Sequence, residues 1–134
     1  MALDNILLID DDEVANQLHQ KLIQKLKLAK NIFTEKDGRD GLDFIRQRYY
    51  GFHSLPSLII LDLNMPVMDG VDFLKEICHS DLLFVNRIPI AVLTNSVHPE
   101  EDMKRITEIR NCYYISKPLT EEKLLQVIEQ AFVE

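Results

Sequence analysis

The chain has 134 residues, a common size for one compact unit with one hydrophobic core, so the sequence predicts a single domain over residues 1–134. Its 46% apolar and 28% charged residues are the proportions of an ordinary globular protein and exclude a disordered chain. The 15 basic and 22 acidic side chains give a net charge of −7, which disfavours binding to nucleic acid or to an anionic membrane.

Five short apolar runs recur along the chain and predict five β-strands. They lie at residues 6–9, 32–33, 58–61, 90–93 and 112–115. Four of the five contain no alternation of apolar and polar residues. Such runs are typical of strands that are buried on both faces, as in a parallel sheet covered by helices on both sides.

Amphipathic stretches between and after these runs predict five helices. Their approximate ranges are 13–27, 37–50, 71–79, 100–109 and 120–132. In the first stretch Val14, Leu18 and Leu22 stand four residues apart, which predicts that these three residues form the inward apolar face of the helix. In the last stretch Thr120 is the predicted N-cap, and the acidic Glu121 after it is favourable near the positive end of a helix.

The strict alternation of strands and helices predicts an α/β fold. We expect a doubly wound, five-stranded parallel sheet with five helices and right-handed crossovers. The flavodoxin-like strand order 2-1-3-4-5 is the first choice for such a sheet. Ligands bind outside the carboxyl ends of the strands in this architecture, so the residues that follow the apolar runs are the candidates for a site.

Polar side chains follow four of the five runs. Asp10 and Asp11 follow the first, Asp62 the third, Thr94 the fourth and Lys117, one residue further on, the fifth. Three carboxylates at one edge repel each other, and a hard cation with oxygen ligands, such as Mg²⁺, would neutralise them. Such a metal would screen an incoming phosphoryl group so that Asp62 can attack phosphorus. Lys117 and Thr94 would then bind the other phosphoryl oxygens.

Four segments that contain these residues read ILLIDDDE, LIILDLNMPVMDG, AVLTNS and YYISKPL. In this order they resemble the signatures of the response-regulator receiver (CheY-like) family, over residues 6–119 and, with the final helix, nearly the whole chain. The resemblance implies a stand-alone single-domain response regulator of a two-component phosphorelay. It implies a sensor histidine kinase or a histidine phosphotransfer protein as phosphodonor, and a downstream protein target or a second copy of the chain as partner.

The resemblance also implies roles for the residues around the phosphoryl group. Asp62 matches the phosphoacceptor, and Asp10 and Asp11 match the acidic pair that binds Mg²⁺. Asp62 and the backbone carbonyl of Asn64 complete the implied metal ligands. On this basis the chain assists its own phosphorylation and dephosphorylation and is not a turnover enzyme.

A second set of residues matches the switch of the family. Thr94 matches the switch hydroxyl, Lys117 the phosphate-binding lysine and Tyr114 the switch aromatic. The Lys117-Pro118 bond is implied to be cis. When the phosphoryl group draws Thr94 towards Asp62, the Tyr114 ring is expected to turn inward and to change the surface of the fourth helix, fifth strand and fifth helix.

Structural alternatives remain for these residues, because an acid can cap a helix or form a turn, and a threonine or a tyrosine can simply pack in a strand. A phosphatase of the haloacid dehalogenase type would need an acid two residues after Asp62, where this chain has Asn64. A flavin-binding module would need small residues after the first strand, where residues 10–13 are all acidic. A receiver that signals without phosphorylation is a third alternative.

The sequence predicts a cytoplasmic protein. It shows no signal peptide and no apolar run near the ~20 residues that span a bilayer, so no membrane contact is expected. Cys78 and Cys112 lack a Cys-x-x-Cys spacing and are expected to be reduced. The histidines lack ligand spacing, and each is expected to have a surface or packing role; they are His19, His53, His79 and His98.

Overall fold

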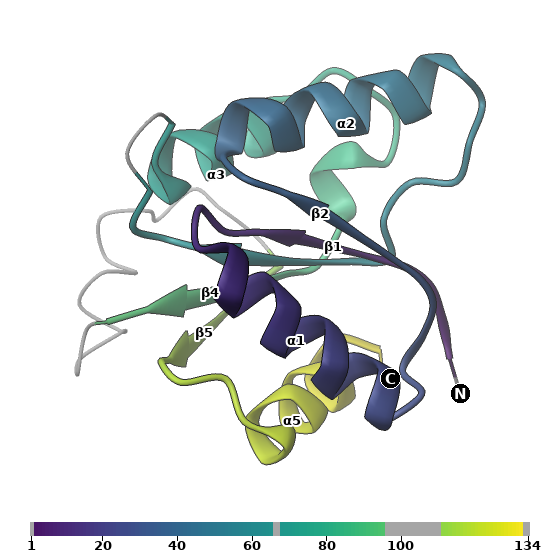
Figure 1. Ribbon diagram of the computed structural model, residues 1–134. Coiled ribbons are helices and arrows are strands. Elements are labelled where there is room, and N and C mark those ends of the chain that lie inside the picture. Colours follow the sequence, from purple (N-terminus) through teal and green to yellow (C-terminus); the bar gives the residue numbers. More distant parts are fainter. Residues whose placement is uncertain (1, 66–67, 96–110, 133–134) are drawn as a thin grey trace.

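The computed structural model describes residues 2–65, 68–95 and 111–132, which form a parallel sheet between two layers of helices (Figure 1). Within these ranges the sheet has five strands, in the order β2-β1-β3-β4-β5, so the predicted order is confirmed. The strands are β1 (Leu3–Ile9), β2 (Ala29–Glu35), β3 (Leu58–Asp62), β4 (Ile90–Thr94) and β5 (Cys112–Ser116). All neighbouring strands pair in parallel.

Four α-helices cover the sheet in the described part of the chain. They are α1 (Glu13–Lys25), α2 (Gly38–Tyr50), α3 (Gly70–Cys78) and α5 (Glu121–Phe132). In Figure 1, α2 and α3 lie on one face of the sheet, and α1 and α5 lie on the other. A short 3-10 helix, η1 (Val85–Arg87), was not predicted. The fifth predicted helix, over residues 100–109, lies outside the described residues.

Each of these four α-helices begins after a side chain that accepts a hydrogen bond from a backbone N–H of the first turn. The four capping residues are Asp12, Asp37, Asp69 and Thr120. The predicted Thr120 cap is confirmed by a distance of 3.3 Å from Lys123 N to Thr120 Oγ1. These caps supply partners for N–H groups that a helix cannot satisfy itself, and they fix the short loops between the strand ends and the helices.

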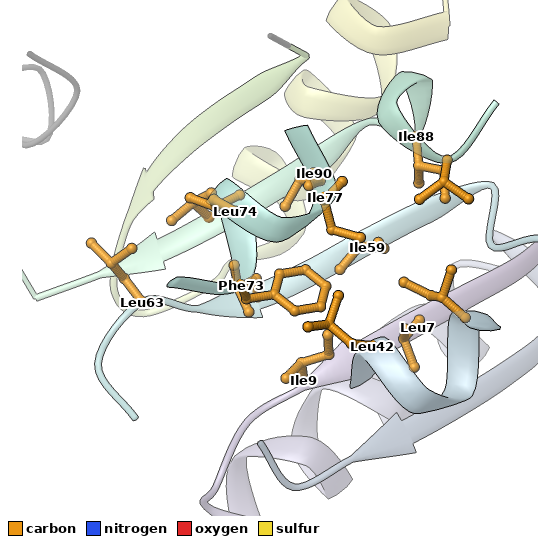
Figure 2. Packing of buried hydrophobic residues seen from close by; sticks show 14 of the residues in the cluster. Leu7, Ile9, Leu42, Ile59, Leu63, Phe73, Leu74, Ile77, Ile88 and Ile90 are labelled. Atoms are coloured by element: carbon orange, nitrogen blue, oxygen red, sulfur yellow. The ribbon is translucent and has the colours of Figure 1, made fainter. Parts of the chain in front are cut away.

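The core consists of two apolar layers, one on each face of the sheet. Leu7 and Ile9 of β1 belong to the layer under α2 and α3, whereas Ile6 and Leu8 belong to the layer under α1 and α5. Figure 2 shows the fully buried Phe73 ring of α3 in the first layer. Because successive strand residues point to opposite faces, burial on both sides explains why β3, β4 and residues 6–9 of β1 read as continuous apolar runs.

None of the helices in the described ranges is long and apolar enough to cross a membrane.

The prediction that Val14 and Leu18 lie on the inward face of α1 is wrong. Val14 and Leu18 are 62% and 60% exposed, and the buried residues of α1 are Asn16 and Ile23. Asn16 and Ile23 are seven residues apart, close to two turns at about 3.6 residues per turn, so they share a face. Val14 and Leu18 each stand two residues from Asn16 and therefore lie on the opposite side. The polar Asn16 concealed this face in the sequence; its Nδ2 donates to the Asp10 carbonyl at 3.0 Å.

Candidate functional site

The three predicted carboxylates meet at the carboxyl ends of β1 and β3. Ile9 of β1 pairs with Leu61 of β3, so Asp10 and Asp62, which follow them, lie side by side. One oxygen from each of Asp10, Asp11 and Asp62 lies within 4.8 Å of the others. Asp10 and Asp62 are almost completely buried, and Asp11 is exposed. Clustered oxygen donors with one side open to solvent suit a divalent cation that keeps several water ligands.

Lys117 forms an ion pair with the deepest of these carboxylates. Its Nζ lies 2.8 Å from Oδ1 of Asp62, whose side chain is 4% exposed. The same Oδ1 accepts a hydrogen bond from the backbone N of Asn64 at 3.1 Å. The Asp62 carboxylate is thus held by one cation and one backbone donor, and contacts between a carboxylate and a cation are strong where the carboxylate is buried.

The loop that carries Lys117 is fixed from two sides. The backbone N of Lys117 donates to the Thr94 carbonyl at 2.9 Å, and the bond from Lys117 to Pro118 is cis, which confirms the prediction. Lys123 of α5 donates from Nζ to the carbonyls of Ser116 and Pro118 at 2.8 and 3.2 Å. This anchor was not predicted from the sequence. A lysine in the first turn opposes the helix dipole, and here the carbonyls of Ser116 and Pro118 bind its ammonium group.

Burial makes Asp10 hard to ionise. It raises the pKa of Asp10 from 3.8 to about 6, against the lowering effect of a 2.9 Å hydrogen bond from the backbone N of Asp12. The neighbouring charges of Asp62 and Asp11 also raise this pKa, whereas the Lys117 ammonium lowers it. A proton therefore competes with a cation for Asp10 at mildly acidic pH.

The carboxylates open into a cavity of about 770 Å³. Its lining includes five predicted site residues, namely Asp10, Asp11, Asp62, Asn64 and Lys117. Helix α1 adds side chains that were not predicted, among them Leu18 and His19. These side chains reach the cavity because of the rotation of α1 about its own axis, which the sequence pattern alone did not reveal.

The two predicted switch residues lie on one face of the sheet. Thr94 is 2% exposed at the end of β4, next to Leu93 and Asn95, which line the cavity. Tyr114 of β5 is half-buried and packs against the layer under α2 and α3, opposite Val92 in the register. Val92 belongs to the same layer, and Thr94, two residues further along β4, points to the same face.

Comparisons with known proteins agree with this arrangement. Residues 6–129 match the sequence model of the response regulator receiver domain. Response regulator Rcp1 of Synechocystis sp. is 33% identical over 133 residues, which cover 96% of this chain and 88% of Rcp1.

Solved structures show the same fold. A two-component response regulator from Cytophaga hutchinsonii superposes with a TM-score of 0.85 at 26% identity, covering all of both chains. The phosphorylated cyanobacterial phytochrome response regulator RcpA superposes with a TM-score of 0.73 at 30% identity, covering 96% of this chain and 91% of RcpA.

Proposed function

Because the chain belongs to the response regulator receiver domain family and therefore acts in two-component phosphorelay signalling, we propose that Asp62 accepts the phosphoryl group. The observation that supports this proposal most strongly is the 2.8 Å ion pair of Asp62 with Lys117, within the cluster of three carboxylates. This arrangement combines a nucleophile, a cation for phosphoryl oxygens and ligands for a metal in one cavity.

We propose that Asp10, Asp11 and Asp62 hold Mg²⁺, with the backbone carbonyl of Asn64 as a further ligand. When bound, the metal would supply positive charge that screens the phosphoryl group from the Asp62 carboxylate. The exposed Asp11 leaves the cluster open to solvent, which suits a metal that retains water ligands.

The chain's own residues complete the transfer. Asp62 attacks the phosphorus, the donor keeps the electron pair of the broken bond, and Lys117 passes from the carboxylate to a phosphoryl oxygen. The Thr94 hydroxyl donates to another phosphoryl oxygen. The phosphoryl group stays on the protein, so the domain is a phosphoacceptor switch. A turnover phosphatase of the haloacid dehalogenase type would need an acidic residue at position 64, where this chain has asparagine.

Labelling with acetyl phosphate and Mg²⁺ tests this proposal. The intact mass of the wild-type protein should increase by one phosphoryl group, and Asp62→Ala should show no increase, because it lacks the nucleophile. The matched control is Asp43→Ala, which removes an exposed aspartate of α2 and should be labelled like the wild type. Labelling of Asp62→Ala at the wild-type rate would exclude Asp62 as the acceptor.

Receiver domains interact with kinases and with downstream targets. We propose that a sensor histidine kinase or histidine phosphotransfer protein approaches this chain along α1. The exposed Val14 and Leu18 support this direction, because Leu18 also lines the cavity that contains Asp62. Apolar side chains exposed beside a reactive group are typical of a protein contact site.

The output partner is a target protein or a second copy, and we propose that it binds the surface of β5, α5 and the helix predicted over residues 100–109. The packing of Tyr114 on the same face as Thr94 supports this route. The phosphoryl group can shift the equilibrium between a resting and an activated conformation only if Thr94 binds it better in one conformation than in the other.

Beryllofluoride, which mimics the phosphoryl group, should therefore change the amide chemical shifts of β5 and of residues 117–124 in the wild type. In Thr94→Ala and Tyr114→Ala the large changes should be confined to residues that line the cavity. The control Thr34→Ala changes an exposed threonine of β2 and should respond like the wild type. Unmoved β5 and α5 resonances in the wild type would contradict the route.

We further propose that the protein acts in the cytoplasm without direct contact with nucleic acid or membrane. Its two thiols, Cys78 and Cys112, form no disulfide, as suits a reducing compartment. The net charge of −7 favours protein partners and cations over polyanions.

A further inference from the structure

One wall of the phosphoacceptor cavity takes no part in the bond-making and bond-breaking steps described above. It is formed by α1, which contributes Ala15, Leu18, His19 and Leu22 to the lining. Three of these side chains are apolar. Among the residues that line the cavity, His19 is the one whose side chain exchanges a proton near neutral pH in its unperturbed state.

The surroundings of His19 favour its neutral form. Burial lowers the pKa of His19, and the Lys117 ammonium on the loop after β5 lowers it further. Asp62 at the end of β3 and Asp12 at the start of α1 act in the opposite direction, but the pKa remains below its ordinary value of 6.5. The cavity also holds two further carboxylates, Asp10 and Asp11. A neutral imidazole can accept a proton, which an imidazolium cannot.

We propose that His19 accepts the proton of the water that hydrolyses the aspartyl phosphate, and that it thereby sets the lifetime of the phosphorylated state. This inference rests on the proposed role of Asp62 as phosphoacceptor. In the reaction the water oxygen forms a bond to phosphorus, and the bond from phosphorus to the Asp62 oxygen breaks. The electron pair stays on the Asp62 carboxylate, the proton passes to the imidazole and then to solvent, and inorganic phosphate leaves.

The cavity has the size and polarity that this step requires. Its volume of about 770 Å³ holds a phosphoryl group and several waters, since a water takes roughly 30 Å³ of liquid. The apolar side chains of Leu18 and Leu22, which line the same wall as His19, offer water no hydrogen bonds, so the imidazole is the polar partner that α1 gives to a water there. The charge of a phosphoryl group on Asp62 would raise the pKa of His19 towards the working pH, where a general base is most effective.

The test is the decay of the phosphorylated protein after removal of the phosphodonor, followed by intact mass across the pH range in which histidine titrates. In the wild type the decay rate should rise with pH and then level off. In His19→Gln it should be roughly 100-fold slower, at the low end of general-base effects, and should lose this rise. The matched control His53→Gln changes an exposed histidine in the loop between α2 and β3 and should decay like the wild type.

His19→Asn serves as a second variant in case His19→Gln does not fold, and the rate of labelling shows whether each variant retains an intact site. Normal labelling of Asp62 with a wild-type decay rate and pH profile would overturn the role of His19. A slower decay that keeps the wild-type pH profile would also overturn it, because the effect would then be structural. If the proposed function itself is wrong, the result is different: the wild-type protein is then not labelled on Asp62 at all.

Discussion

In the absence of divalent cations, Asp10→Asn should increase the free energy of unfolding at neutral pH by an amount on the order of 2 kcal/mol. Burial is the main cause that raises the pKa of Asp10 to about 6, so at neutral pH the folded protein contains an ionised carboxylate that is 5% exposed. Asparagine removes this charge and keeps an oxygen that can accept the hydrogen bond from the backbone N of Asp12. The same substitution should abolish stabilisation by Mg²⁺.

The raised pKa of Asp10 also makes the stability of the metal-free protein depend on pH. A carboxyl group whose pKa is higher in the folded state binds its proton more tightly when folded. Its stabilising contribution is complete below the unfolded value of 3.8 and is lost as the pH rises through about 6. Metal-free wild-type protein should therefore gain stability from this group as the pH falls from neutral through about 6, and Asp10→Asn should lack this gain.

Urea unfolding in the presence of a chelator measures both the free energy of unfolding at neutral pH and its change with pH. Asp11→Asn is the matched control, because Asp11 is exposed and its substitution should change metal-free stability little. If Asp10→Asn unfolded at lower urea than the wild type at neutral pH, the burial cost assigned to Asp10 would be wrong.

Gly70→Ala should destabilise the fold by about 1 to 3 kcal/mol and should also slow phosphorylation, because it acts on the backbone that follows Asp62. A Cβ at Gly70 would lie 2.6 Å from the Leu63 Cα, 2.9 Å from the Leu63 carbonyl oxygen and 3.0 Å from the Asp62 carbonyl oxygen. These are backbone atoms, which cannot rotate away as a side chain would. The backbone N of Gly70 also donates to the Leu63 carbonyl at 2.9 Å, so separation of the two segments would strain this bond.

Urea unfolding and the rate of labelling by acetyl phosphate test this prediction together. The control for the labelling rate is Gly51→Ala at the end of α2, where the atoms nearest to an added Cβ belong to Gln47 and His53, which do not line the cavity. Unchanged stability and an unchanged labelling rate in Gly70→Ala would show that the loop after Asp62 tolerates the displacement.

Local signals explain why much of the fold was predictable. The five apolar runs and the capping residues act through neighbours in the sequence, and they located the strands and several helix ends. The extent of β1 was harder to predict. It begins at Leu3 and includes the buried Asn5, whose backbone N donates to Ser57 Oγ at 3.3 Å. That partner lies 52 residues away, so no local pattern shows that a polar residue there belongs to a strand.

The same distinction applies to the candidate site. Asp10, Asp11, Asp62 and Lys117 were predictable as neighbours because they follow strands, and parallel strands bring their carboxyl ends to one edge. His19 reaches the cavity only because Asn16, and not Leu18, faces the sheet. That rotation of α1 follows from tertiary packing, which overrides the spacing of apolar residues along the helix.

Chemical trapping tests whether Asp62 carries the phosphoryl group. Wild-type protein is labelled with acetyl phosphate and Mg²⁺ and then treated with borohydride, which reduces an aspartyl phosphate to homoserine. Peptide mass spectrometry should find homoserine at position 62 and unmodified aspartate at positions 10 and 11. Homoserine at either of those positions, or a phosphoryl group retained on His19 with Asp62 unmodified, would show that a residue other than Asp62 accepts the phosphoryl group.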